Sequence, residues 1–69
     1  MNYRELTRRL NHLNCVLDRQ ARGSHEIWIN LHTGARTTIP NWGNRDLKPG
    51  TVSNILRDLG IAKKDFEGK

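Results

Sequence analysis

The sequence is poor in the features that support metal centres, disulfide frameworks and membrane spans. Cys15 is its one cysteine, so no internal disulfide bond can form, and the cysteine and the histidines lack the spacing of a zinc site. No apolar run approaches the length of a membrane span, and residues 1–10 are too charged for a signal peptide. We therefore expect a cytoplasmic protein that holds no metal or other cofactor and depends on packing for its stability.

Acidic residues are in the minority. The 69 residues include 12 lysines and arginines but 7 aspartates and glutamates, which gives a net charge of +5. On so small a body this charge produces a positive field that favours a polyanionic partner, and nucleic acid is the first candidate. A chain of this length forms one domain at most and buries only about 60% of the surface of its unfolded state. Any chemistry is therefore expected on an open surface and on a large substrate.

The first segment has the pattern of an amphipathic helix. Asn2 can cap it, and Glu5 three residues later completes a pair that resembles a capping box. Apolar residues recur at spacings of three and four, namely Tyr3, Leu6, Leu10 and Leu13. The opposite face is either solvated or a set of phosphate contacts, and we favour the first; it carries Arg4, Arg8, Arg9 and His12.

Three short segments with β-branched or aromatic residues follow this helix. They cover residues 15–20, 26–31 and 35–39, and turn-like sequences separate them. This pattern predicts a three-stranded antiparallel meander that ends at Pro40, followed by a loop over 41–45.

A second helix is predicted to start near Pro49 or Thr51 and to end at Gly60, a residue suited to a helix C-terminal cap. Its apolar stripe consists of Val52, Ile55, Leu56 and Leu59. The order α-β-β-β-α predicts an α+β fold over residues 1–69, with two helices on one face of the sheet and the other face open. Double-stranded-RNA-binding domains have this layout. Residues 61–69 are expected to form a partly flexible tail, although Phe66 is able to pack back onto the body.

Several short motifs follow one another at specific separations. Gly23-Ser24-His25 comes after the first predicted strand, and Thr38-Ile39-Pro40 closes the third. The run DLKPGT over residues 46–51 is then followed by Ile55-Leu56 and Leu59-Gly60-Ile61. From the first helix to Ile61, this succession resembles the HicA toxins, also called YcfA-like proteins.

The resemblance implies a fold, an activity and a partner. Members of this family adopt the double-stranded-RNA-binding fold and are toxins of type II toxin–antitoxin systems. They cleave messenger RNA, and each is neutralised by an antitoxin called HicB. The histidine of their glycine-serine-histidine motif is the catalytic residue, and it corresponds to His25. The resemblance thus implies an endoribonuclease that uses His25 as general acid or base, with RNA and a HicB-type antitoxin as partners.

Two departures from the family pattern bear on the mechanism. Many relatives have a second histidine directly after the first, where this sequence has Glu26, and another after the third strand, where it has Asn41 and Trp42. A mechanism with two acid–base histidines is therefore not expected. One histidine can suffice, because imidazole accepts protons near neutral pH and RNA carries its own nucleophile, the 2′-hydroxyl. The sequence has no carboxylate cluster suited to a metal ion, so we predict metal-independent cleavage.

Cations beside the histidine are expected to bind phosphates and to stabilise the charge that develops on them. The residues predicted to bind RNA are Arg22, Gly23, Ser24, Arg36, Arg45 and Lys48. Gly23 is expected to adopt a backbone conformation that other residues disfavour. Ser24 is expected to contact a phosphate or shape the turn, and not to act as a nucleophile, because adjacent strand residues point to opposite faces.

Histidines at strand starts more often serve turns or surfaces, so the assignment of His25 depends on the family motif. His12 lies opposite the leucine stripe and His32 lies in a predicted turn, so neither is predicted to be catalytic.

The two tryptophans leave alternatives open. Strand alternation places His25 on the same face as Ile27 and Ile29, with Trp28 on the other face. Either Trp28 lies on the open sheet and stacks on a base, or it is part of the core and His25 lies on the open face. We favour the second arrangement, because a catalytic His25 must reach RNA. Trp42 is either exposed in its loop or a lid over the edge of the core.

Two other functions fit the same composition. The chain is alternatively an RNA-binding module without catalysis, or a protein-interaction domain whose charge is incidental. The first alternative keeps RNA binding when His25 is replaced and never cleaves RNA. The second shows no salt-dependent affinity for RNA.

Overall fold

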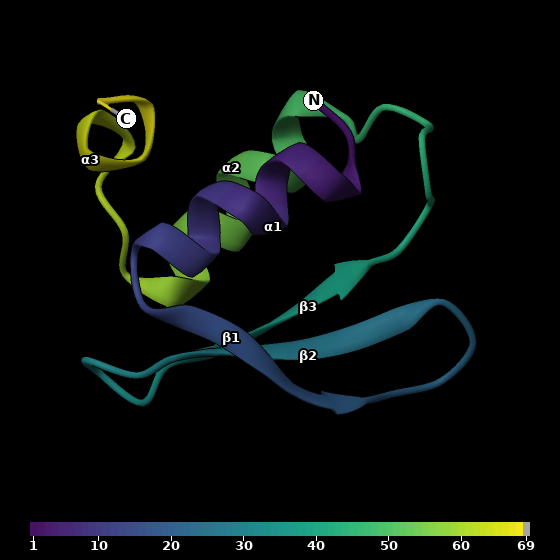
Figure 1. Cartoon of the computed structure of the whole chain (residues 1–69), viewed down its shortest axis with the longest axis horizontal. Coiled ribbons are helices and arrows are strands. Elements are labelled where there is room, and N and C mark those ends of the chain that lie inside the picture. Colours follow the sequence, from purple (N-terminus) through teal and green to yellow (C-terminus); the bar gives the residue numbers. More distant parts are fainter. Residues whose placement is uncertain (69) are drawn as a thin grey trace.

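The computed structural model describes residues 1–68, and Lys69 of the predicted tail lies outside them. The elements are α1 (Tyr3–His12), β1 (Cys15–Gln20), β2 (His25–Asn30), β3 (Arg36–Pro40), α2 (Pro49–Leu59) and α3 (Lys63–Glu67). The strands form one antiparallel sheet in the order β1-β2-β3, and the helices lie together on one side of it (Figure 1). The predicted α+β class with an open three-stranded sheet is therefore confirmed.

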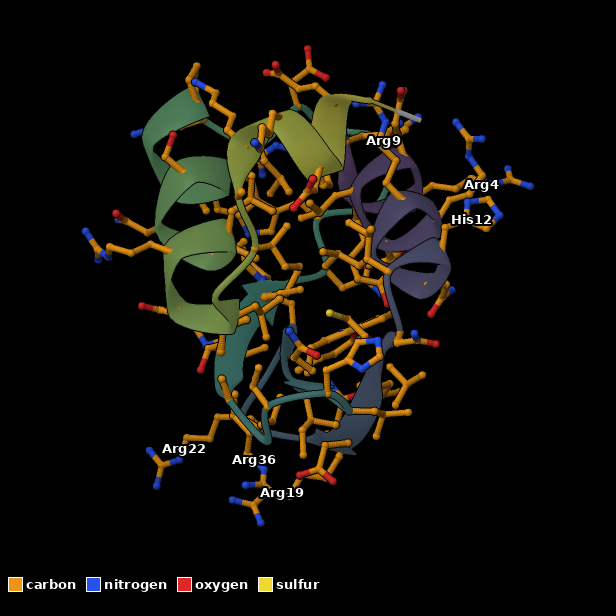
Figure 2. The ribbon with its side chains drawn as sticks, turned by 90° about the vertical axis from the view of Figure 1, so that its left-hand side faces the viewer. Arg4, Arg9, His12, Arg19, Arg22 and Arg36 are labelled. Atoms are coloured by element: carbon orange, nitrogen blue, oxygen red, sulfur yellow. The ribbon has the colours of Figure 1, made fainter. Side chains whose placement is uncertain are left out.

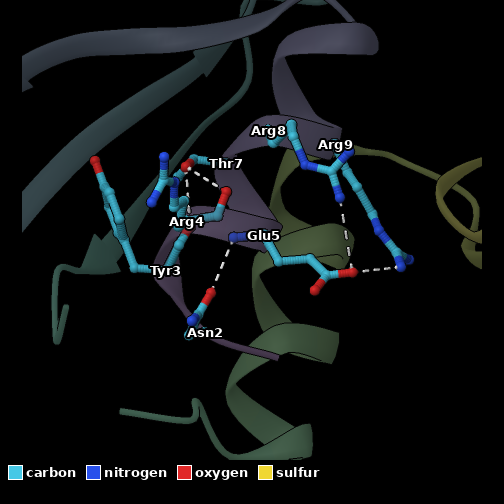
Figure 3. A network of polar contacts seen from close by, with 7 residues as sticks. All are labelled: Asn2, Tyr3, Arg4, Glu5, Thr7, Arg8 and Arg9. Atoms are coloured by element: carbon cyan, nitrogen blue, oxygen red, sulfur yellow. Dashed lines mark hydrogen bonds and ion pairs between the residues drawn. The ribbon is translucent and has the colours of Figure 1, made fainter. Parts of the chain in front are cut away.

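The helix α1 begins as its sequence predicts. The side chain of Asn2 accepts a hydrogen bond from the Glu5 backbone N–H at 3.0 Å (Figure 3). The Glu5 carboxylate lies against Arg9, with 2.8 Å between Oε2 and Nη2, so an ion pair takes the place of the second half of the capping box. Leu6 and Leu10 of the apolar stripe are fully buried, and this face of α1 packs on the sheet.

The helices cover the face of the sheet that carries Trp28. The Trp28 side chain is only 4% exposed, and Glu26 and Asn30, which share its face, are also buried. His25 on the other face is exposed. Of the two arrangements that alternation allows, the one with Trp28 in the core is therefore confirmed. The Asn30 side chain donates to the Leu59 carbonyl at 2.8 Å, which ties the sheet to the end of α2.

The edge strand β1 contains a β-bulge. Leu17 pairs with Trp28, but Arg19, and not Asp18, pairs with Ile27. Regular alternation would place Arg19 on the same face as Leu17. The extra residue at position 18 changes this, because a bulge sets two residues of one strand opposite one residue of its partner. Arg19 thereby reaches the open face of the sheet.

The C-terminal part forms more structure than predicted. Gly60 ends α2 with φ of 71°, a left-handed conformation that suits glycine, so the predicted cap is confirmed. The next segment, predicted to be a partly flexible tail, contains α3, and Phe66 from this helix is buried in the core. The Arg9 guanidinium lies over the Phe66 ring at 5.3 Å. The buried core consists of Leu6, Leu10, Cys15, Trp28, Ile39, Leu47, Ile55, Leu56, Leu59 and Phe66.

Candidate nucleic-acid interface

His25 is the first residue of β2, directly after a tight hairpin turn. The turn closes on its backbone, because the His25 N–H donates to the Arg22 carbonyl and the Ala21 N–H donates to the His25 carbonyl, both at 2.9 Å. The Gln20 side chain also donates to the His25 carbonyl at 3.1 Å. Gly23 has φ of 56°, as its predicted role requires. The His25 backbone is thus fixed while its side chain stays exposed.

The third strand holds the same turn from the other side. His25 pairs with Pro40 across the sheet, and the Asn41 N–H donates to the Ser24 carbonyl at 2.8 Å. Ser24 therefore has a backbone role in this turn.

Glu26 carries a buried carboxylate whose role the sequence did not indicate. It accepts hydrogen bonds from the Tyr3 hydroxyl at 2.6 Å, from Trp28 Nε1 at 3.0 Å and from Asn41 Nδ2 at 3.4 Å. These contacts join α1, β2 and the loop after β3. Burial, followed by the hydrogen bond and the negative charge of Glu26, raises the pKa of Tyr3 far above its ordinary value. Position 26 faces the helices, so a histidine there would not lie beside His25.

Three arginines project from the open side of the sheet. Arg19, Arg22 and Arg36 project together, away from the helices (Figure 2). Arg36 Nε lies 3.2 Å from Asp18 Oδ2 in an exposed ion pair. Arg22 and Arg36 are among the predicted RNA-binding residues. Sequence reasoning missed Arg19, because the bulge that turns it to this face leaves no clear signal in the local pattern.

The other two predicted cations lie apart from the sheet. Arg45 and Lys48 belong to the segment between β3 and α2, and this segment contacts the N-terminal end of the chain through a hydrogen bond from the Leu47 N–H to the Met1 carbonyl at 2.8 Å. The Arg45 guanidinium stacks over the Trp42 ring at 5.1 Å. The structure therefore brings Arg22 and Arg36 to the face of His25 and leaves Arg45 and Lys48 on a separate segment.

Trp42, His12 and His32 lie where they serve the fold or face solvent. Trp42 is partly buried and packs against the core, which favours its interpretation as a lid. His12 is exposed at the end of α1. His32 lies in the turn after β2 with its Nε2 atom 2.7 Å from Asn14 Nδ2, as expected for a turn residue.

Apolar side chains form a strip on the open face between these charges. Val16 pairs with Ile29 across the sheet, and Ile27 lies two residues before Ile29. Val16 is 37% exposed, and both isoleucines are partly exposed. An apolar strip with a basic edge suits either an RNA backbone or a protein partner with acidic and apolar groups.

Residues 1–68 contain neither a cluster of metal ligands nor a membrane-spanning helix. No three histidine, cysteine or carboxylate side chains in this part of the chain gather as metal ligands would. The helices of the same part are too short or too polar to cross a membrane.

Comparison with known families identifies most of the chain. A family model described as "HicA toxin of bacterial toxin-antitoxin" matches residues 3–61, which run from the start of α1 to just beyond α2. No curated protein and no solved structure matches the chain. The matched segment includes the turn before His25 and the whole sheet.

Proposed function

The chain belongs to the HicA toxin family of bacterial toxin–antitoxin systems, and on this basis we propose that it is an endoribonuclease that cleaves messenger RNA with His25. The observation that supports this activity is the placement of His25. Its backbone is held by the hairpin turn and by β3, and its side chain is exposed on the open face, three residues after Arg22 in the turn; Arg36 shares this face but pairs with Ile29, four residues along β2.

The proposed reaction uses the nucleophile of the substrate. His25 accepts the proton of a ribose 2′-hydroxyl, and the 2′-oxygen attacks the adjacent phosphorus. The new 2′-oxygen–phosphorus bond forms as the bond to the 5′-oxygen breaks, and water supplies a proton to the leaving oxygen. A cyclic phosphate and a free 5′-hydroxyl result. Arginine side chains stabilise the negative charge that builds on the phosphate oxygens during this step.

The substitution His25→Ala tests the proposal. We expect the variant to remain folded, because the side chain is exposed, and to lose cleavage by about 10²–10⁴-fold, the usual contribution of a positioned general base. Circular dichroism reports the fold, and incubation with messenger RNA reports the activity. A folded variant that cleaves at the wild-type rate would contradict the assignment.

The chemistry has its own controls. An RNA with deoxyribose at the cut position is expected to resist cleavage, because it lacks the nucleophile. A chelator is expected to have no effect. Activity that disappears in chelator and returns with magnesium would indicate another mechanism.

As a toxin of this family, the chain acts with an antitoxin partner. We propose that the chain acts in the cytoplasm and that its partner is of the HicB type and covers His25. The apolar strip of Val16, Ile27 and Ile29 offers anchoring positions, and the arginines at its edge attract acidic groups. A standard interface uses about 800 Å² on each partner, about a sixth of the surface of 4611 Å², and the apolar strip and the arginines favour the face of His25 for it. RNA and antitoxin are therefore expected to share one face.

Competition between RNA and antitoxin tests this arrangement. The His25→Ala variant, which is expected to bind RNA without cutting it, is mixed with labelled RNA and titrated with antitoxin. We expect the antitoxin to displace the RNA completely. A stable ternary complex at saturating antitoxin would show that inhibition works by another route.

A further inference from the structure

Arg19 is brought to the open face by the bulge in β1. Its cross-strand partner is Ile27, which lies on the same face as His25 and two residues after it. Arg19 is therefore a diagonal neighbour of His25 on this face. Diagonal neighbours in an antiparallel pair are about 7–8 Å apart, a separation that long side chains can span. The Arg19 guanidinium and the His25 imidazole are thus able to contact one bound group.

The two arginines of the strands, Arg19 and Arg36, differ in their ion pairing. Asp18, the extra residue of the bulge, forms an ion pair with Arg36. Across residues 1–68, the carboxylates that form ion pairs engage other groups, and Arg19 takes part in none of these pairs. Arg19 is exposed and points away from the helices, on the same side as Arg22 (Figure 2). Among residues 1–68, Arg19 is therefore a cation without an ion-pair partner, at the position diagonal to the exposed histidine.

We propose that Arg19 is a phosphate-binding residue of the open-face site. It holds the phosphodiester next to the bond on which His25 acts, and this role rests on the proposed ribonuclease function. The guanidinium is planar and presents parallel N–H donors, so it binds two phosphate oxygens at once. A lysine at this position would keep the charge but lose the paired donors.

The matched control for Arg19 is Arg57. Arg57 lies on α2, its side chain is 74% exposed, and its paired carboxylate is that of the adjacent Asp58. Arg19→Ala and Arg57→Ala each remove one positive charge and one exposed guanidinium. The two variants therefore lower the net charge equally, and any difference between them reports position.

Binding is measured with a labelled single-stranded RNA and proteins that carry His25→Ala, by fluorescence anisotropy over a series of salt concentrations. We expect Arg19→Ala to weaken binding about tenfold, as the loss of a charged hydrogen bond does. The slope of log affinity against log salt is expected to fall by about 0.7, the value of one single-strand phosphate contact. Arg19→Lys is expected to keep the slope and to recover part of the affinity. Arg57→Ala is expected to change neither quantity measurably.

Two different results would overturn the proposed role of Arg19, and only the second would also overturn the proposed function. The parent protein in both is the His25→Ala protein. If the parent protein binds RNA with a clear salt slope and Arg19→Ala behaves like Arg57→Ala, Arg19 does not bind phosphate and the proposed function is untouched. If the parent protein shows no salt-dependent binding and the wild-type protein cleaves no RNA, the proposed function and the role of Arg19 fail together. Circular dichroism of each variant confirms that the fold is intact.

Discussion

Neighbouring residues of β2 meet opposite surroundings on the two faces of the sheet. On the covered face, Trp28 is 4% exposed and donates a hydrogen bond to Glu26, which is 6% exposed and also accepts from Tyr3 of α1 and from Asn41 after β3. On the open face, His25 is exposed and Ile27 is only partly buried. Within one strand, the covered residues hold the helices on the sheet, while the residues between them remain accessible to a partner. Stability and function can therefore be changed separately by substitutions one position apart.

Replacement of Trp28 is expected to have the largest effect on stability. Trp28→Ala leaves a cavity in the core and should lower the free energy of unfolding by about 3–5 kcal/mol. The matched open-face variant Ile27→Ala should lower it by about 1 kcal/mol, because its side chain is already in partial contact with water. Urea denaturation followed by circular dichroism measures both values.

If Trp28→Ala is unfolded throughout, Trp28→Phe provides the comparison with Ile27→Ala. Equal losses of unfolding free energy for the Trp28 and Ile27 variants would contradict the conclusion that the covered face carries the stability.

Replacement of Glu26 should have the next largest effect. Glu26→Ala leaves the Tyr3 hydroxyl and the Trp28 N–H without their acceptor, and we expect a loss of about 3 kcal/mol. Glu26→Gln keeps one acceptor oxygen and should cost about 1 kcal/mol. His25→Ala, one residue away, should change stability by less than about 0.5 kcal/mol. Thermal unfolding ranks the stability of the three variants. If His25→Ala lost as much stability as Glu26→Ala, the difference between the covered and the open face would be contradicted.

High pH should lower the free energy of unfolding by a smaller amount, because it ionises Tyr3, whose hydroxyl donates to Glu26 on the covered face. The pKa of Tyr3 is raised in the folded protein, chiefly by burial and then by Glu26, whereas an unfolded chain ionises tyrosine near pH 10. The folded state therefore keeps a proton that the unfolded state loses. This contribution is complete below pH 10 and declines as the pH rises above it.

The measurement uses the fact that the sequence contains 1 tyrosine. Tyrosinate absorbance is expected to appear well above pH 10, together with loss of the helical circular dichroism signal. Tyrosinate that forms near pH 10 in a folded protein would contradict the prediction. Tyr3→Phe removes this titration and serves as the control.

Features that depend on nearby residues could be predicted from the sequence. The stripe of α1, the Asn2 cap and the left-handed Gly60 each involve residues within a few positions of one another, and the structure contains all three. The left-handed turn at Gly23 belongs to the same class. The helix α3 was not predicted, because its five residues show too short a pattern for a helical period.

Features that depend on distant residues could not be predicted from local patterns. Alternation alone permits both faces for Trp28, and the correct choice came from the requirement that a catalytic His25 reach RNA; in the structure, the packing of the helices decides it. The Glu26 carboxylate is satisfied by groups from α1 and from the loop after β3, which the local sequence does not bring together. The sequence by itself determined the order of elements from α1 to α2, the positive charge and the turn before the histidine, because these follow from composition and from short-range periodicity. Only the tertiary structure decided that Arg19 lies on the same face of the sheet as His25. This placement depends on a bulge, which arises from the pairing of two strands and is not a property of either strand alone.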